Sequence, residues 1–583
     1  MSEIKPFTMI LQALRAMVRV DEVWLAVLAA AIGVAGGLGV VAINSATSWM
    51  HAALFTLPLG QGLSESSSLP PLRTILVPGL GGLVLGLSMW ALAKLRPHNL
   101  VDPIEANALY GGRMSLQDSI IVAVQTLWSN GVGASVGMEA GYAQFGAGVA
   151  SRVGQVLRLR RNDLRVLVGC GAAAAIGGAF NAPLCGAFYG IELIIGVYSI
   201  ATLLFVVIAA LAGTLTVQIA GMASPPLIVT LPASVPNSAY ALIIIEGMAC
   251  GLAGIAIMRG VTSIEVLFRR SKIPLWARAA LGGLVVGLMG CLTPQAMSSG
   301  HSALHAYINV SFPFFVVLGI LLAKAVASAF SIGAGFRGGL FFASLFLGAL
   351  FGKVFAGVVG IIPFITPMPA GLYAVVGMSG LAAAIVGGPM TMTFLALEST
   401  QNFAVTMAVL AASIAATLTV RRFFGYSFAT WRFHLRGEQI RSAVDVGWLK
   451  ALTVGRMMRP VSAVVRAKAG IDAFRQDVPL GATQRAVVTD EAGRYAGIAY
   501  PAEAAAMPGD GLVESILHLQ DRFLLPGQSV KEALAAFEAA QADALAVLDG
   551  PETRQVLGLL TEQYALRRYN EELDRRRREM AGE

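Results

Sequence analysis

The feature that most constrains this chain is a series of apolar stretches that are long enough, in most cases, to cross a lipid bilayer. The stretches are residues 23–43, 72–95, 164–192, 194–222, 239–266, 277–292, 312–330 and 405–420. About 20 mostly apolar residues predict a transmembrane helix. With 56% hydrophobic and only 13% charged residues, the chain is predicted to be a multi-pass membrane protein. No combination of nucleophile, base and orienting group appears outside the stretches, so an enzyme is not expected.

One carboxylate, Glu139, lies in an otherwise uncharged stretch rich in glycine, residues 131–142. Ionisable groups inside a membrane are costly, and they usually line a pathway or pair with a partner. The glycines allow close backbone approach, and free N–H groups at helix starts attract anions. We therefore interpret Glu139 as a negative side chain placed where a permeating anion would bind. An acid paired near a helix end is the alternative.

The membrane part contains an internal repeat. Pro183 is followed by Glu192 in the first half, and Pro389 is followed by Glu398 in the second, at the same interval of nine residues. A glycine-rich segment precedes each of these elements. Paired, glycine-interrupted segments indicate a transporter built from repeats, with its site near the midplane between them. Glu398 itself is expected to be a helix-end acid that faces solvent.

From about residue 452 the composition becomes that of a soluble α/β module. Short strands are predicted at residues 464–467, 486–489, 523–525 and 545–548, with a helix at 530–541 capped by Ser529. Residues 485–498 resemble residues 544–559, so this module is also expected to be a repeat.

The net charge of +8 includes basic runs beside the apolar stretches. Such runs are typical of cytoplasmic flanks, so we expect both termini to be cytoplasmic in a cell inner or plasma membrane, without a cleaved signal peptide and without nucleic acid as a partner. The four cysteines are expected to pack as small apolar groups, and the six histidines show no metal-ligand spacing, so no metal site is expected.

Four segments of the chain are distinctive: Gly137-Met-Glu-Ala-Gly141, Ala179-Phe-Asn-Ala-Pro-Leu-Cys-Gly186, Gly338-Gly-Leu-Phe-Phe-Ala343 and the segment from Ser427 to Gly437. In this order they resemble the CLC family of chloride channels and proton-coupled chloride transporters. The soluble module resembles a pair of CBS domains. The expected organisation is a cytoplasmic segment (1–22), two membrane repeats (23–222 and 239–425), a linker (426–451), the CBS-like pair (452–570) and a charged tail (571–583).

The resemblance implies an all-α membrane domain with inverted-topology repeats and broken helices, followed by a soluble α/β CBS pair. It also implies a homodimer in the lipid bilayer with one pore per subunit, in which helix N-termini converge on a dehydrated chloride. By position, the backbone N–H groups of Leu340 and Phe341 would bind the anion. Glu139 would be the gate, and its mutation should remove voltage- or pH-dependent closure.

Several positions depart from the family pattern. The place of the pore serine falls on Leu100, so we expect the amide of Asn99 to bind the anion instead. Met138 replaces the basic neighbour of the gate. The tyrosine that closes the inner pore mouth maps to Ala429, with Tyr426 three residues earlier, and its loss should widen that mouth. The sequence therefore does not decide whether the transported anion is chloride, fluoride, nitrate or bromide.

The proton pathway also departs from the pattern. In proton-coupled members a second glutamate relays protons, and that position is Leu193 in this chain, next to Glu192. Together with the lost tyrosine, this change favours passive, channel-like or weakly coupled conduction. A chloride/proton antiporter that uses Glu139 with Glu192 as a substitute relay is the alternative.

No cofactor is expected to be required. The CBS-like repeats carry Gly497-Ile-Ala-Tyr-Pro-Ala-Glu503 and Gly558-Leu-Leu-Thr-Glu-Gln-Tyr564, which lack the full pattern that contacts an adenine nucleotide. We therefore favour a structural or dimerising role for the tail over nucleotide binding. A CBS-linked divalent-cation transporter is the alternative from another class, but it would need acidic clusters in its spans, and the acids here are isolated.

Overall fold

The computed structural model describes residues 22–96, 100–363, 368–436 and 452–581, which form two compact units divided near residue 444. The first unit is helical, and nine of its described helices are long and apolar enough to cross a membrane. The predicted spans are therefore confirmed as helices. The largest differences are in the first span, whose helix continues to Phe55, and at Phe341–Val359, a span-length helix that was not among the predicted stretches. In residues 194–222 the helix begins only at Ile200 because Gly196, with φ of 79°, ends the preceding turn.

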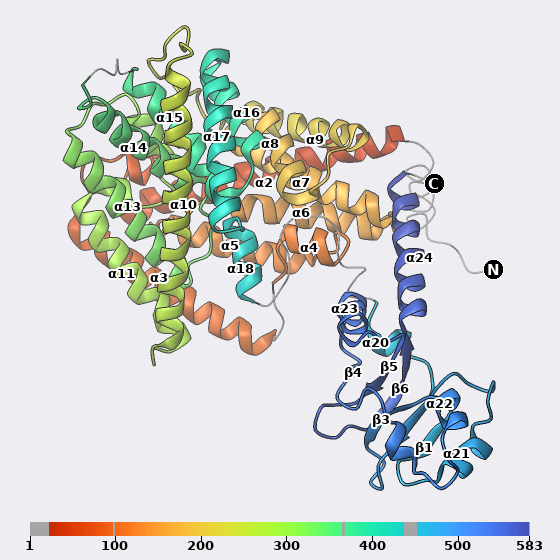
Figure 1. Cartoon of the computed structure of the whole chain (residues 1–583). Helices are drawn as coiled ribbons and strands as arrows, with labels where there is room; N and C mark the ends of the chain where they lie inside the picture. Colours follow the sequence, from red (N-terminus) through yellow and green to blue (C-terminus); the bar gives the residue numbers. More distant parts are fainter. Residues whose placement is uncertain (1–21, 97–99, 364–367, 437–451, 582–583) are drawn as a thin grey trace, which may run out of the picture. The chain divides into compact units, whose positions relative to one another are not determined.

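The first half of the helical unit runs from α2 to α9 (Figure 1). Its helices are α2 (Glu22–Phe55), α3 (Pro71–Leu95), α4 (Pro103–Leu109), α5 (Leu116–Gly131), α6 (Glu139–Val156), α7 (Arg161–Phe180), α8 (Pro183–Tyr189), a π-helical turn (Gly190–Ile195) and α9 (Ile200–Ile219).

The second half runs from α10 to α18. Its helices are α10 (Ala239–Arg270), α11 (Leu275–Leu292), α12 (His301–Tyr307), α13 (Phe314–Ala334), α14 (Phe341–Val359), α15 (Ala370–Val386), α16 (Pro389–Thr400), α17 (Phe403–Phe423) and α18 (Phe428–Leu435). Helices α10 and α17 pack side by side, as Figure 1 shows.

Both halves contain a broken helix at the predicted place. Helix α7 ends at Asn181, with φ of 54°, and Pro183 begins α8. Helix α15 ends at Gly387, with φ of 91°, and Pro389 begins α16. A left-handed residue ends a helix, and proline is well suited to the first position of the next one. The same local sequence chemistry therefore produces the same break twice.

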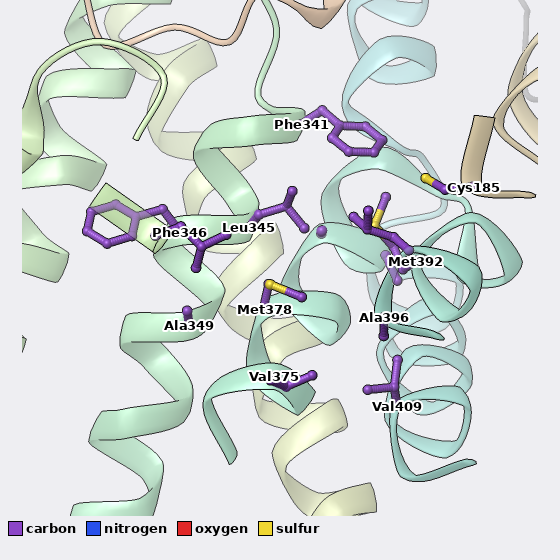
Figure 2. Packing of buried hydrophobic residues seen from close by; sticks show 14 of the residues in the cluster. Cys185, Phe341, Leu345, Phe346, Ala349, Val375, Met378, Met392, Ala396 and Val409 are labelled. Carbon is purple, nitrogen blue, oxygen red and sulfur yellow. The ribbon is translucent and has the colours of Figure 1, made fainter. Parts of the chain in front are cut away.

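Glycine pairs bring the repeated helices close together. A Cβ atom on Gly146 of α6 would lie 2.2 Å from the carbonyl oxygen of Gly171 in α7, and one on Gly348 of α14 would lie 2.3 Å from that of Gly377 in α15. Helices can approach this closely only where both lack side chains. Figure 2 shows a cluster of buried apolar side chains to which these helices contribute, among them Leu345 of α14, Met378 of α15 and Met392 of α16.

The second unit contains two similar three-stranded sheets. The first consists of β1 (Val464–Arg466), β2 (Ala486–Thr489) and β3 (Tyr495–Ala499), and the second of β4 (Phe523–Leu524), β5 (Ala544–Leu548) and β6 (Val556–Thr561). In both, the first pair of strands is parallel and the second pair antiparallel. The predicted repeat is therefore confirmed, and each predicted strand agrees with the structure to within one residue at either end.

The helices of this unit are α20 (Val454–Met457), α21 (Ile471–Asp477), α22 (Pro501–Ala506), α23 (Val530–Ala540) and α24 (Glu562–Ala581). The Ser529 cap of α23 is confirmed, with Glu532 completing a capping box. The segment from residue 571, set apart in the sequence as a charged tail, continues α24 as far as Ala581. Ion pairs such as Arg567 with Glu571 lie along this helix.

Candidate functional site

The two glycine-rich segments of the repeats meet directly. Gly137 and Gly339 form an antiparallel bridge in which each N–H donates to the other carbonyl, at 2.9 and 3.1 Å. Helix α6 begins two residues after the first glycine, at Glu139, and helix α14 begins two residues after the second, at Phe341. The bridge therefore places the first turns of two helices, from opposite halves of the chain, side by side.

The Glu139 carboxylate lies across this bridge. Its Oε1 atom accepts a hydrogen bond from the backbone N–H of Phe341 at 2.7 Å, and its Oε2 atom is buried without a partner among the described residues. The residue is only 4% exposed, and Leu340 and Phe341 are each 3% exposed. A negative group is thus bound at a helix N-terminus in a nearly dry place, where helix ends favour anions.

A cavity of about 280 Å³ adjoins the carboxylate. It brings together four of the residues singled out in the sequence: Glu139, Leu340, Phe341 and Ala429. Leu100 also lines it, whereas Asn99 lies outside the described residues. The arrangement can hold an anion beside backbone N–H groups without placing a fixed cation directly on it.

Two tyrosines are relevant to the expected loss of an aromatic ring at Ala429. Tyr426 does not line the cavity, because its ring stacks on His434 with centroids 4.7 Å apart. Tyr189, at the end of α8, does line it, and its ring lies edge-on to that of Phe341 at 5.9 Å. The Tyr189 hydroxyl makes no hydrogen bond to the described protein. Sequence reasoning missed this residue because its relation to Phe341 depends on how α8 packs against α14.

The two repeat-related glutamates bind each other's repeat. Glu192 accepts hydrogen bonds from the N–H groups of Met390 and Thr391, at 3.1 and 2.9 Å, and from the Thr391 hydroxyl at 2.7 Å, at the start of α16. Leu193, rather than Glu192, is among the residues that line the cavity.

Glu398 is the symmetric counterpart. Its carboxylate accepts hydrogen bonds from the N–H groups of Leu184 and Cys185, both at 2.8 Å, at the start of α8. The expectation that this acid simply faces solvent is therefore wrong. The amide groups at the start of a helix have no partner within the helix, and a carboxylate from the other repeat satisfies two of them here.

Comparison with known proteins identifies the family to which the chain belongs. Residues 81–421 match the family described as voltage gated chloride channel. The chain is 31% identical over 406 residues to a ClcB-like chloride channel protein of Ralstonia nicotianae, covering 67% of this chain and 92% of that protein. It is 30% identical over 400 residues to the voltage-gated ClC-type chloride channel ClcB of Salmonella typhimurium, covering 68% and 95%.

Solved structures share the fold. A slow cyanobacterial Cl⁻/H⁺ antiporter aligns with a TM-score of 0.61 at 23% identity, over 71% of this chain and 97% of that one. A eukaryotic CLC transporter aligns with a TM-score of 0.60 at 17% identity, over 94% of this chain and 98% of that one. Together with the sequence matches, these likenesses establish that the chain belongs to the CLC family of voltage gated chloride channels.

Proposed function

We propose that this protein conducts chloride across a membrane and that Glu139 is the gate of its pore. The observation that carries the proposal is the 2.7 Å hydrogen bond from the Phe341 N–H to the Glu139 carboxylate. A chloride ion and this carboxylate need the same kind of donor at the same helix start, so they compete for it. Protonation or displacement of Glu139 frees the site for the anion. The names of the relatives, which describe chloride channels, favour chloride as that anion.

We further propose that conduction is passive or weakly coupled to protons. Leu193 cannot carry a proton, and the Glu192 carboxylate is engaged by three hydrogen bonds at the start of α16. Proton exchange through Glu192 would require these bonds to open during each cycle. Ala429 carries only a methyl group at the place where the family pattern has a tyrosine, although Phe428 and Phe433 line the same cavity.

For the rest of the molecule, we propose a homodimer and a structural role for the CBS pair. Adenine nucleotide binding has little support there, because Glu503 is paired with His518 at 2.7 Å. Light scattering on the purified protein tests the dimer directly, by its mass relative to the 60.8 kDa chain.

The deciding experiment measures chloride flux from proteoliposomes together with internal pH. The parent should carry chloride faster as the pH falls, because protonated Glu139 no longer competes with chloride. Glu139→Gln should remove this pH dependence and leave a steady flux. Glu65→Gln, which changes an exposed glutamate of the same unit, is the matched control and should behave as the parent does.

The pH record separates the two modes of conduction. Chloride movement without proton movement supports passive conduction. If a chloride gradient drives protons uphill in the parent, and Glu192→Gln stops this, the protein is an antiporter and the passive proposal is wrong. Absence of chloride flux in both the parent and Glu139→Gln would refute chloride as the substrate.

A further inference from the structure

Arg337 is a cation inside the membrane unit that lacks a counter-charge. It lies two residues before Gly339, and its backbone N–H donates to the Ser129 hydroxyl at 3.0 Å, which holds the segment in place. Its side chain lines the same cavity as Glu139 and Phe341. The guanidinium Nε is buried without a hydrogen-bond partner, and the guanidinium forms no ion pair with a carboxylate of the described ranges.

Arg432 of α18 and Arg436, which directly follows this helix, also line the cavity and lie within electrostatic reach of Arg337. Arg436 is neutralised by Glu105 at 3.2 Å. Arg432 lies over the ring of Phe428, with its guanidinium carbon 5.8 Å from the ring centroid, and forms no close ion pair with a carboxylate among the described residues. Like charges that gather in a poorly solvated place repel one another unless an anion lies between them.

The other charged groups on the cavity wall leave Arg337 unpaired. Arg269 is exposed, and Glu265 lies four residues before it on α10. Asp102 accepts a hydrogen bond from the Ile104 N–H at 2.8 Å and interacts electrostatically with Arg432 and Arg436. Glu139 is bound to Phe341. None of these three carboxylates forms an ion pair with Arg337 in the described structure.

The chemistry of the guanidinium group indicates the kind of anion. Its planar fork of N–H donors matches two oxygens of a planar oxoanion, whereas a lysine would act as a point charge. The buried Nε atom of Arg337 lacks an acceptor, and an anionic ligand would supply one. Ala429 carries only a methyl group, and the cavity of about 280 Å³ is larger than a small planar oxoanion requires.

We propose that Arg337, with Arg432 beside it, binds a small planar monovalent oxoanion, for which nitrate is the probe. This site lies in the cavity next to the Glu139–Phe341 position and is separate from the backbone N–H groups there. The inference rests on the proposed function in that the cavity belongs to the anion pathway. It adds a second binding position with its own selectivity, set by a side chain rather than by backbone.

The test compares nitrate with chloride in the full-length protein. Binding of each anion is measured by calorimetry, and flux of each is measured in proteoliposomes. For the parent, nitrate should bind and should compete with chloride flux. Arg337→Lys keeps the charge and loses the fork, so the nitrate-to-chloride ratio should fall about tenfold, the size of effect expected for a charge-assisted bidentate contact. Arg113→Lys, at an exposed arginine, is the control and should leave the ratio unchanged.

The outcomes separate this inference from the proposed function. If the parent carries chloride but nitrate neither binds nor competes, the oxoanion site is refuted and the chloride proposal stands. If nitrate binds with the expected dependence on Arg337 while chloride does not move, the site stands and the chloride proposal fails. An unchanged ratio in Arg337→Lys refutes the role of this residue. Should that variant not fold, Arg432→Lys must lower the ratio, and a parental ratio in this variant also refutes the site.

Discussion

At the scale of single residues, the position of the Glu139 carboxylate depends on two missing side chains. A Cβ atom on Gly339 would lie 2.2 Å from Oε1 of Glu139, and one on Gly137 would lie 1.9 Å from Oε2. These distances are shorter than any real contact, so only glycine at both positions lets the carboxylate fold over the bridge to reach the Phe341 N–H. The glycines were visible in the sequence, but this use of them was not.

We therefore expect Gly339→Ala to reproduce the loss of the proposed gate, Glu139, without changing that residue. The new methyl group displaces the carboxylate from the Phe341 N–H, which removes a charge-assisted hydrogen bond of about 1.5–3 kcal/mol. Chloride flux at neutral pH should rise about tenfold or more, towards that of Glu139→Gln. Gly319→Ala is the control, because a Cβ atom there meets nothing within 4 Å. A parental flux in Gly339→Ala would mean that the carboxylate does not limit conduction.

At the scale of helices, the two repeats are joined by an exchange of carboxylates. Glu192, after α8, binds the start of α16, and Glu398, near the end of α16, binds the start of α8. Each glutamate therefore satisfies amide groups that its own repeat leaves without a partner. The equal proline-to-glutamate spacing in the sequence reflects the equivalent positions of the two glutamates in their repeats. The spacing alone does not show which amide groups each glutamate binds.

Removing one of these caps should weaken the junction between repeats. Glu398→Ala leaves the N–H groups of Leu184 and Cys185 without an acceptor, at a cost of about 1–3 kcal/mol. The midpoint of thermal unfolding in detergent should fall by several degrees, whereas Glu65→Ala, at an exposed site, should not change it. Equal midpoints for Glu398→Ala and the parent would show that water replaces the carboxylate at no cost.

A second helix-scale prediction concerns Glu246 on α10. This residue is fully buried, and neither carboxyl oxygen has a hydrogen-bond partner in the described protein. Helices α15 and α17 pack against α10. A buried polar group without a partner costs about 1–3 kcal/mol, so Glu246→Leu should raise the unfolding midpoint. Met248→Leu, at an exposed site on the same helix, is the control. A lower midpoint for Glu246→Leu would indicate that the carboxyl is satisfied in the folded protein.

At the scale of the whole chain, local chemistry explains most of the architecture. Apolar length defined the spans, and Asn181 with Pro183 and Gly387 with Pro389 defined the two breaks. In the soluble unit, short apolar runs and the Ser529 cap located four of the strands and helix α23. These features depend on residues that are close in sequence, so a single sequence is sufficient to predict them.

The sequence by itself thus determined most of the membrane spans, the paired broken helices and the CBS-like tail, and it singled out Glu139 as the acid of an otherwise uncharged, glycine-rich stretch. Only the tertiary structure decided what each of these groups meets. The donor to Glu139 is 202 positions away along the chain, and the amide groups bound by Glu398 are more than 210 away. Which acid meets which helix start, and which arginine is left without a counter-charge, depends on how the two repeats pack, because the glycine contacts that set this packing join distant segments.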